Sequence, residues 1–190
     1  LSVVPRGGGA SYTDGYLPAE PDALVVDTGR LDRIVEINTT DRYVVVEAGV
    51  TWARLHEALS GTGLRTPFFG PFSGIAATVG GSISQHSVSW GTGQHGVSAE
   101  SLLGVEVVTG HGELLRTGSW SGERALPFFR FYGPDLTGLF TGDAGALGIK
   151  TRLVLRLVTR PREFVALSFK FGDFDAMLRG MGAAAADGLN

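Results

Sequence analysis

The stretch Pro5-Arg6-Gly7-Gly8-Gly9-Ala10-Ser11 is the part of the sequence that decides the expected fold. It follows the mostly apolar residues 1–4 and contains three consecutive glycines. Because glycine has no Cβ atom, the N–H groups of such a bend can converge on an anion, and a phosphate can touch the backbone directly. An isolated triple glycine is also compatible with a plain flexible turn. The rest of the sequence has to decide between these two interpretations.

Composition narrows the classes of function. The 190 residues include 29 glycines, no cysteine and 43% hydrophobic residues, which is typical of a globular protein of about one domain. A formal charge of -3 without a basic cluster disfavours nucleic acid as a partner and favours a small ligand. Without cysteine, disulfides and thiolate metal sites are excluded, so any redox chemistry needs a bound cofactor.

The apolar runs and the chain ends indicate whether the chain could span a membrane and whether it is a fragment. No apolar run approaches the roughly 18 residues needed to span a bilayer, so we expect a soluble chain without a transmembrane segment. The compartment stays undetermined, with the cytoplasm favoured. Because the sequence starts at Leu1 inside an apolar run and ends at Asn190 just after an apparent helix, we interpret it as a fragment.

Short β-rich runs bounded by turn residues dominate the chain. Those expected to be strands are residues 23–27, 33–38, 43–48, 102–109, 113–117 and 149–158. We expect the first three to be neighbours in one sheet. The fourth and fifth are expected to form a hairpin, because Gly110-His111-Gly112 supplies the turn.

One helix and one long loop are predicted between these strands. Thr51 offers an N-cap, and Trp52, Leu55 and Leu59 form a single apolar stripe, which predicts an amphipathic helix of about ten residues. Residues 66–96 are rich in Gly, Ser, Thr and Pro, have almost no charge and show no regular period. A segment of this kind is more typical of a loop that wraps a ligand than of a spacer.

The C-terminal residues suggest a second domain. Pro161 marks a break, residues 164–171 alternate enough to predict a strand, and Asp173 is placed to cap a helix. That helix would carry Phe174 and Met181 on its apolar face.

Other motifs in the sequence point away from common nucleotide and metal sites. Gly91-Thr92-Gly93-Gln94-His95-Gly96 matches the dinucleotide pattern G-x-G-x-x-G, but no hydrophobic strand precedes it and no long helix follows. A phosphate-binding G-x-x-x-x-G-K-[ST] motif is absent from the sequence. The four histidines are His56, His86, His95 and His111, and their spacing is not that of metal ligands, so we expect no metal site.

Two further segments are glycine-rich in the same way as the first. They are Ala77-Thr78-Val79-Gly80-Gly81-Ser82 and residues 142–149, GDAGALGI. Each alone is compatible with a tight helix start or with close packing against a strand. In this order, however, the three segments resemble the FAD-binding domain of the vanillyl-alcohol-oxidase and p-cresol-methylhydroxylase family. They are most similar to its branch with glycolate oxidase subunits, D-lactate dehydrogenases and alkylglycerone-phosphate synthase.

The resemblance covers the chain from Leu1 to about Pro161. PRGGGAS is similar to the family's pyrophosphate loop, and ATVGGS to the glycine pair that passes close to the flavin. DLTGLFTGDAGALGI, residues 135–149, resembles the segment before the last FAD-contacting strand and is the most specific of the three. The resemblance implies an α+β fold, in which a two-subdomain FAD-binding domain of the FAD-linked oxidase type spans residues 1–162 and lacks its start. Residues 163–190 would begin a substrate or cap domain.

The resemblance also implies the cofactor contacts. The diphosphate would lie on the backbone of Arg6, Gly7, Gly8, Gly9, Ala10 and Ser11; the ribityl chain and flavin would lie along Thr78, Gly80, Gly81, Gln85, His86 and Ser87; and the adenosine half would meet Gly145, Gly148 and Ile149. For His86 a structural role is about as well supported. Many relatives have a glutamate where this chain has Ala144, with Asp143 one position earlier. Covalent members have a histidine where this chain has Ala10, so we expect FAD to be bound non-covalently.

The implied function is FAD-dependent oxidation of a small 2-hydroxy acid, such as glycolate or D-lactate, by hydride transfer to flavin N5. The partners would be this substrate and an electron acceptor. The catalytic residues are expected beyond Asn190, so the chain alone should be inactive. Two alternatives stay open: an alkylglycerone-phosphate-synthase-like enzyme without net oxidation, and an FAD-binding subunit that transfers electrons or holds a complex together.

Overall fold

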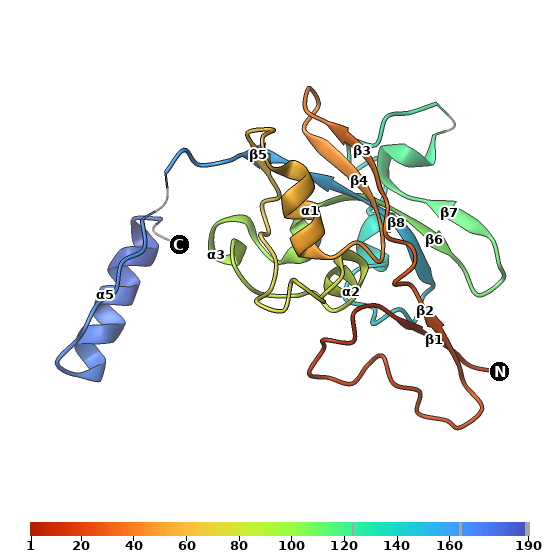
Figure 1. The fold of residues 1–190 in the computed structure, drawn as a ribbon, viewed down its shortest axis with the longest axis horizontal. Coiled ribbons are helices and arrows are strands. Elements are labelled where there is room, and N and C mark those ends of the chain that lie inside the picture. The colour runs from red at the N-terminus through yellow and green to blue at the C-terminus, as the bar shows by residue number, and fades with distance from the viewer. Residues whose placement is uncertain (123, 164, 189–190) are drawn as a thin grey trace.

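The structure is a computed structural model, and it describes residues 1–122, 124–163 and 165–188. Its centre is a five-stranded antiparallel sheet with the strand order β3-β4-β8-β6-β7 (Figure 1). The strands are β3 (Ile34–Asn38), β4 (Tyr43–Glu47), β8 (Ile149–Arg156), β6 (Leu102–Val108) and β7 (Leu114–Arg116). The expected strands at 33–38 and 43–48 are confirmed, as are the strand that begins at residue 149 and the hairpin through Gly112.

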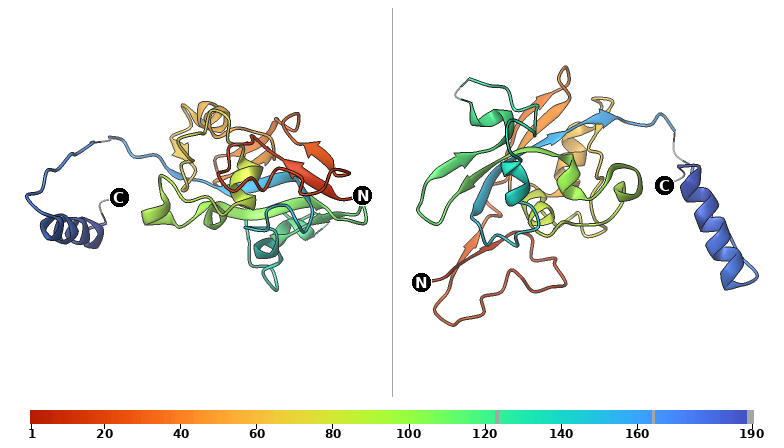
Figure 2. Two further views of the ribbon diagram at one scale, coloured as in Figure 1. Left: turned by 90° about the horizontal axis from the view of Figure 1, so that it is seen from below. Right: turned by 180° about the vertical axis from the view of Figure 1, so that it is seen from behind.

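The sheet is covered on both faces, which explains why β4 is buried at every position. Val44 and Val46 belong to the main core, together with the helix α1 (Trp52–Leu59). Tyr43 and Val45 face a smaller cluster on the opposite side, against which Trp120 packs. Figure 2 shows this second layer, where the segment around the 3-10 turn η2 (Gly118–Ser121) lies across the sheet from α1.

Helix α1 has the start and the buried face that the sequence predicts. The Thr51 side chain accepts a hydrogen bond from the Arg54 N–H group, and Trp52, Leu55 and Leu59 are buried. Burying a side chain of the size of leucine contributes roughly 1.5–3 kcal/mol, so this stripe holds α1 against the sheet.

The strands outside the main sheet correct one prediction. β1 (Val3–Arg6) and β2 (Leu24–Asp27) form a separate parallel pair, so residues 23–27 do not neighbour β3 as expected. The expected strand itself is present, but the loop of residues 7–23 returns the chain beside β1 before the main sheet begins. A second small pair joins β5 (Leu64–Arg65) and β9 (Val158–Thr159).

Residues 66–96 are largely irregular, as expected, but they contain two short helices that the sequence analysis missed. These are α2 (Val79–Ser84) and α3 (Thr92–His95), and the 3-10 turn η1 (Ser98–Ser101) follows them. Gly80 and Gly81 have a low intrinsic helix propensity, so no local pattern predicts α2. Tertiary contacts with β8 stabilise this helix despite its low propensity. One further short helix, α4 (Leu136–Leu139), is capped by Asp135.

The C-terminal part extends away from the sheet (Figures 1 and 2). The strand expected at residues 164–171 is wrong for residues 165–171, which pair with no strand among the described residues, and Phe164 lies outside the described residues. An alternating sequence gains strand hydrogen bonds only when a partner edge is available. The helix α5 (Phe174–Ala186) is confirmed with Asp173 as its N-cap, and it has no buried residue.

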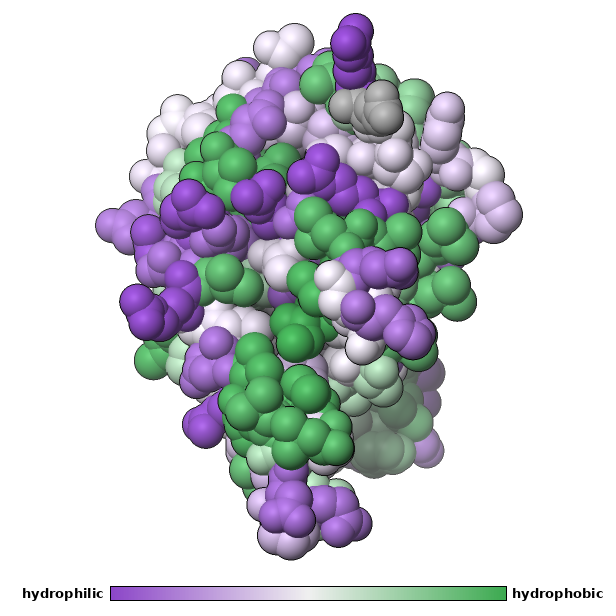
Figure 3. All heavy atoms as spheres, turned by 90° about the vertical axis from the view of Figure 1, so that its right-hand side faces the viewer, coloured by the Kyte–Doolittle hydropathy of each residue, from purple (hydrophilic) through white to green (hydrophobic). Residues whose placement is uncertain are grey.

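Exposed apolar side chains occur at several places on the surface. On the side of the molecule that carries β1, β2 and the β6–β7 hairpin, hydrophobic groups lie among charged ones (Figure 3). Val3, Leu24 and Leu114 are exposed in these elements. No helix that the structure describes has the length and apolar character needed to cross a membrane.

Candidate functional site

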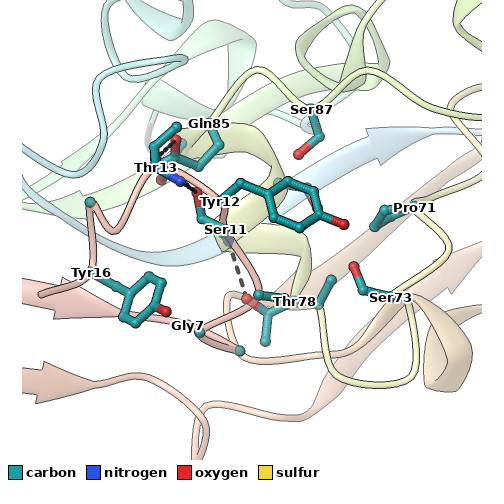
Figure 4. A pocket seen from close by; sticks show the side chains of 18 of the residues that line it. Gly7, Ser11, Tyr12, Thr13, Tyr16, Pro71, Ser73, Thr78, Gln85 and Ser87 are labelled. Carbon is teal, nitrogen blue, oxygen red and sulfur yellow. Dashed lines mark hydrogen bonds between the residues drawn. The ribbon is translucent and has the colours of Figure 1, made fainter.

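A cavity of about 310 Å³ lies between the loop that follows β1 and the segment around α2 (Figure 4). Its lining combines the first two glycine segments of the sequence analysis. The lining residues are Gly7, Gly8, Gly9, Ala10, Ser11, Tyr12, Thr13, Gly15, Tyr16, Pro71, Ser73, Ala77, Thr78, Gly81, Ser82, Ser84, Gln85, Ser87 and Val88. Small and hydroxyl-bearing residues dominate this set, and no carboxylate belongs to it.

The glycines allow the first loop to lie directly against the segment before α2. A Cβ atom on Gly8 would overlap the carbonyl oxygen of Ala76 and lie 2.8 Å from the carbonyl carbon. A Cβ atom on Gly7 would lie 2.5 Å from Thr78 Oγ1. Gly9 has a φ of +62°, a backbone conformation that residues with side chains rarely adopt. The triple glycine is therefore needed to form one wall of the cavity.

The backbone of this loop has free hydrogen-bond donors. Among the described residues, the N–H groups of residues 7–11 donate no hydrogen bond to another backbone group. A row of successive N–H groups without partners is the arrangement that binds phosphate groups in other loops. This is the strongest sign that the plain-turn interpretation of the triple glycine is incorrect.

The α2 segment forms the opposite wall. Thr78 is the N-cap of α2, and its hydroxyl accepts a hydrogen bond of 3.2 Å from the Gly81 N–H group. Gly80 packs against the main sheet, because a Cβ atom there would lie 2.8 Å from the Cβ atom of Ala48. Gln85 lines the cavity, and its Oε1 atom accepts a hydrogen bond of 3.3 Å from Thr13. Ser87 also lines it.

His86 departs from the sequence interpretation. It is not part of the cavity lining, and its exposed ring packs beside Gly142, where a Cβ atom would lie 2.8 Å from Nδ1. Its Nε2 atom lies 3.1 Å from Thr141 Oγ1. The structure therefore places His86 as a link between α2 and the third glycine segment.

The third segment lines a smaller crevice of about 40 Å³ next to the cavity. Gly145 and Gly148 are in its lining, together with Arg6 and Gly80. Gly7 and Gly81 line both spaces, so the crevice continues the cavity. Ile149 is not in the lining of either space; its backbone pairs with Val108 in the sheet.

Lys150 is a residue of this crevice that the sequence analysis missed. Its Nζ atom lies 2.6 Å from Asp143 Oδ1, and the two side chains are only 3% and 4% exposed. Burial lowers the pKa of Lys150, and the hydrogen bond from its ammonium to Asp143 opposes that effect. Asp143 also accepts a hydrogen bond from the Gly145 N–H group. No local signal in the sequence links a lysine in a strand to an aspartate seven positions earlier.

The sequence analysis also missed the aromatic side of the cavity. Tyr12 and Tyr16 follow the glycine loop and line the cavity. Figure 4 shows the Tyr12 ring extending from the loop toward Pro71. The Arg6 guanidinium lies 5.6 Å from the centre of the Tyr16 ring, a distance at which a cation is attracted to the ring face.

The histidines outside the cavity have structural surroundings. His56 packs against Phe69, with ring centres 4.0 Å apart, and burial lowers its pKa. Burial also lowers the pKa of His95, whose Nε2 atom lies 3.5 Å from the Arg65 guanidinium. Over residues 1–122, 124–163 and 165–188, no three His, Asp or Glu side chains are grouped so that they could hold a metal ion.

The site fits an elongated cofactor with a diphosphate in its middle. The free N–H groups of the glycine loop suit the phosphates, and the cavity and the crevice extend from the loop toward Ser87 and Lys150. Residues 1–118 match a family of proteins described as FAD binding domain. The chain belongs to this FAD-binding family. FAD is therefore the cofactor of this domain.

Relatives of this FAD-binding domain are oxidoreductases by name. It is 32% identical over 176 residues to the glycolate oxidase subunit GlcD of Bacillus subtilis, an alignment that covers 93% of this chain and 36% of the relative. It is 29% identical over 171 residues to the mitochondrial D-lactate dehydrogenase [cytochrome] of Arabidopsis thaliana, which covers 90% of this chain and 28% of that protein. The domain thus spans about a third of the length of these relatives.

A solved structure shares the fold. The structure of an alkyldihydroxyacetonephosphate synthase superposes with a TM-score of 0.71 at 20% sequence identity, covering 85% of this chain and 28% of that chain. The α+β fold of the FAD-linked oxidase type, expected from the sequence, is confirmed by this likeness and by the family match.

Proposed function

We propose that this FAD-binding domain holds FAD with the diphosphate on the backbone N–H groups of residues 7–11. The observation that carries this proposal is the row of unpaired donors on a loop whose glycines bring it against Thr78. A doubly charged diphosphate needs N–H donors more than it needs cations. Ala10 offers no nucleophilic atom, which supports non-covalent binding.

The two halves of FAD extend from this loop in opposite directions. The flavin half lies in the larger cavity, where Thr78, Gly81, Gln85 and Ser87 form the wall. The adenosine half points toward the crevice of Gly145 and Gly148, before the start of β8 at Ile149. Gly80 lines this crevice and also packs α2 against Ala48. His86 acts indirectly, because its ring lies within hydrogen-bond distance of Thr141 and lines neither space.

The proposed reaction of the whole protein is oxidation of a small 2-hydroxy acid such as glycolate or D-lactate. The names of the two curated relatives support this substrate class. FAD held by these residues would supply a hydride acceptor at flavin N5, and a second acceptor would take up the electrons. The residues of this chain bind and orient the cofactor, and the open side of the cavity leaves access for a substrate. We place the boundary to a substrate or cap domain at residues 162–163, shortly after β9 ends at Thr159.

Anaerobic mixing of the FAD-loaded whole protein, rather than residues 1–190 alone, with D-lactate or glycolate tests the reaction. We expect loss of the oxidised flavin absorbance band with D-lactate or glycolate. L-Lactate, which has the same composition as D-lactate, serves as the control for specific positioning of the substrate hydrogen. A protein that binds FAD fully but whose flavin no 2-hydroxy acid reduces would contradict the reaction and favour an FAD-binding subunit or an enzyme without net oxidation.

A further inference from the structure

The buried pair of Lys150 and Asp143 lies at the closed end of the FAD site. Lys150 is the second residue of β8, and it lines the crevice that continues the cavity past Gly7 and Gly81. The two side chains are 3% and 4% exposed. Removing both charges from water has a desolvation penalty that a single ion pair does not readily offset. A pair at this place therefore needs a further explanation.

The hydrogen bonds of the pair are distributed unequally. Asp143 accepts from the Lys150 ammonium at 2.6 Å, from the Gly145 N–H group at 3.1 Å and from the Leu147 N–H group at 3.4 Å. The carboxylate is thus fully engaged. A protonated lysine has three N–H donors, and among the described residues only Asp143 lies within hydrogen-bond distance of Nζ. The other donors of Lys150 have no protein acceptor, although the side chain lines a crevice.

The size and position of the crevice limit what these donors can meet. At about 40 Å³ it admits a phosphate or hydroxyl oxygen and not a ring system. It begins at Gly7, at the start of the loop to which we assign the diphosphate, on the side away from Gln85 and Ser87. A cofactor whose flavin lies toward Ser87 therefore presents its adenylate half to Lys150.

We infer that Lys150 donates a hydrogen bond to an oxygen of the adenylate half of FAD, and that Asp143 positions the ammonium for this contact. This inference rests on the orientation given under the proposed function. This hydrogen bond would make the site bind FAD more tightly than FMN, since FMN has no adenylate half. Lys150 is then a binding residue, and Asp143 is a positioning residue.

The test compares the affinities of three probes, FAD, FMN and ADP, for the protein stripped of flavin. The informative variant is Asp143→Asn with Lys150→Met, because it removes both charges and leaves no unpaired buried ion. We expect its dissociation constants for FAD and ADP to rise by roughly tenfold or more, as for loss of a charge-assisted hydrogen bond. Its dissociation constant for FMN should stay at the wild-type value. Asp143→Asn with Lys150→Gln provides a second, more conservative variant should the first fail to fold.

Two controls separate binding from structure. Asp143→Asn alone keeps the ammonium and should lose less affinity for FAD than the double variant. Arg116→Met removes one partner of another buried carboxylate, Glu106, which keeps its contacts with Arg152 and Thr151. Arg116 lines neither the cavity nor the crevice, so this variant should leave all three affinities unchanged. Equal losses for FAD and FMN, or an unchanged affinity for FAD and ADP, would overturn the inference. Failure of 2-hydroxy acids to reduce the flavin would leave it intact, whereas a wild-type protein that binds no FAD would reject it together with the proposed function.

Discussion

At Gly8, both the fold and the cofactor site require a residue without a Cβ atom. A Cβ atom there would collide with the carbonyl group of Ala76, which is backbone and cannot rotate away. The loop would have to move off the segment before α2, and its N–H groups would move with it. The glycine is therefore required by packing within the protein, in addition to any contact with phosphate.

We expect Gly8→Ala to destabilise the protein by about 1–3 kcal/mol, as for overpacking of a tight contact, and to weaken FAD binding. Gly110→Ala is the matched control, because a Cβ atom at Gly110 meets nothing within 4 Å. Chemical denaturation and titration with FAD measure both effects. A Gly8→Ala protein with wild-type stability and wild-type affinity for FAD would show that the loop does not depend on this contact.

At the same scale, the sequence singled out some of the residues that line the cavity and the crevice, and did not single out others. The glycines of residues 7–9 were identifiable because a run of residues without Cβ atoms has few uses other than a tight bend or a close approach. Lys150 and Asp143 were not identifiable, because a buried ion pair depends on where a strand and the loop before it meet in space. His86 was assigned to the flavin from its neighbours in sequence, but its positive φ of 48° turns its ring toward Gly142.

At the scale of elements, two helices begin with the same capping residue but differ in their relation to the site. Thr51 caps α1 and Thr78 caps α2, and each hydroxyl accepts a backbone N–H group of its own helix. Only Thr78 lines the cavity. The two positions therefore allow the stability of a helix start to be separated from binding of the cofactor.

Replacing either threonine by alanine removes a cap and should lower the free energy of unfolding by roughly 0.5–2 kcal/mol. We expect Thr78→Ala also to raise the dissociation constant for FAD, and Thr51→Ala to leave it unchanged. Thr78→Ser keeps the hydroxyl and should restore both properties. Thermal unfolding and fluorescence titration provide the two measurements. An equal effect of both alanine variants on FAD binding would indicate that the helix starts act only through global stability.

The elements that were predictable from the sequence are those whose signal is local. Helix α1 has an apolar stripe and a cap, and the β6–β7 hairpin has alternating residues around a glycine turn. Helix α2 is short and contains two glycines, so its formation depends on its packing against β8. Residues 165–171 show the opposite case, since an alternating pattern without a partner strand forms no strand.

At the scale of the whole molecule, the site exists because the sheet brings distant segments together. β8 lies between β4 and β6 in the sheet although it follows both in the sequence. This order places the start of β8, with the third glycine segment before it, beside the loop after β1 and beside α2. Strand order of this kind depends on long-range pairing, which no local pattern specifies, so only the resemblance to a known family suggested that the three segments would meet.

A cofactor that touches all three segments should stabilise them as a unit. A ligand present at 100 times its dissociation constant raises the free energy of unfolding by about 2.7 kcal/mol. We therefore expect FAD to raise the unfolding temperature, and to slow hydrogen exchange most in the segments 7–16, 71–88 and 145–150, which contain most of the residues that line the cavity and the crevice. Helix α5 has no buried residue and should exchange equally fast with and without FAD. Hydrogen exchange measured by mass spectrometry tests this distribution, with NAD as the control ligand. Protection centred instead on α5, or on the shallow surface around Arg33 and Arg54, would place the cofactor elsewhere on the molecule.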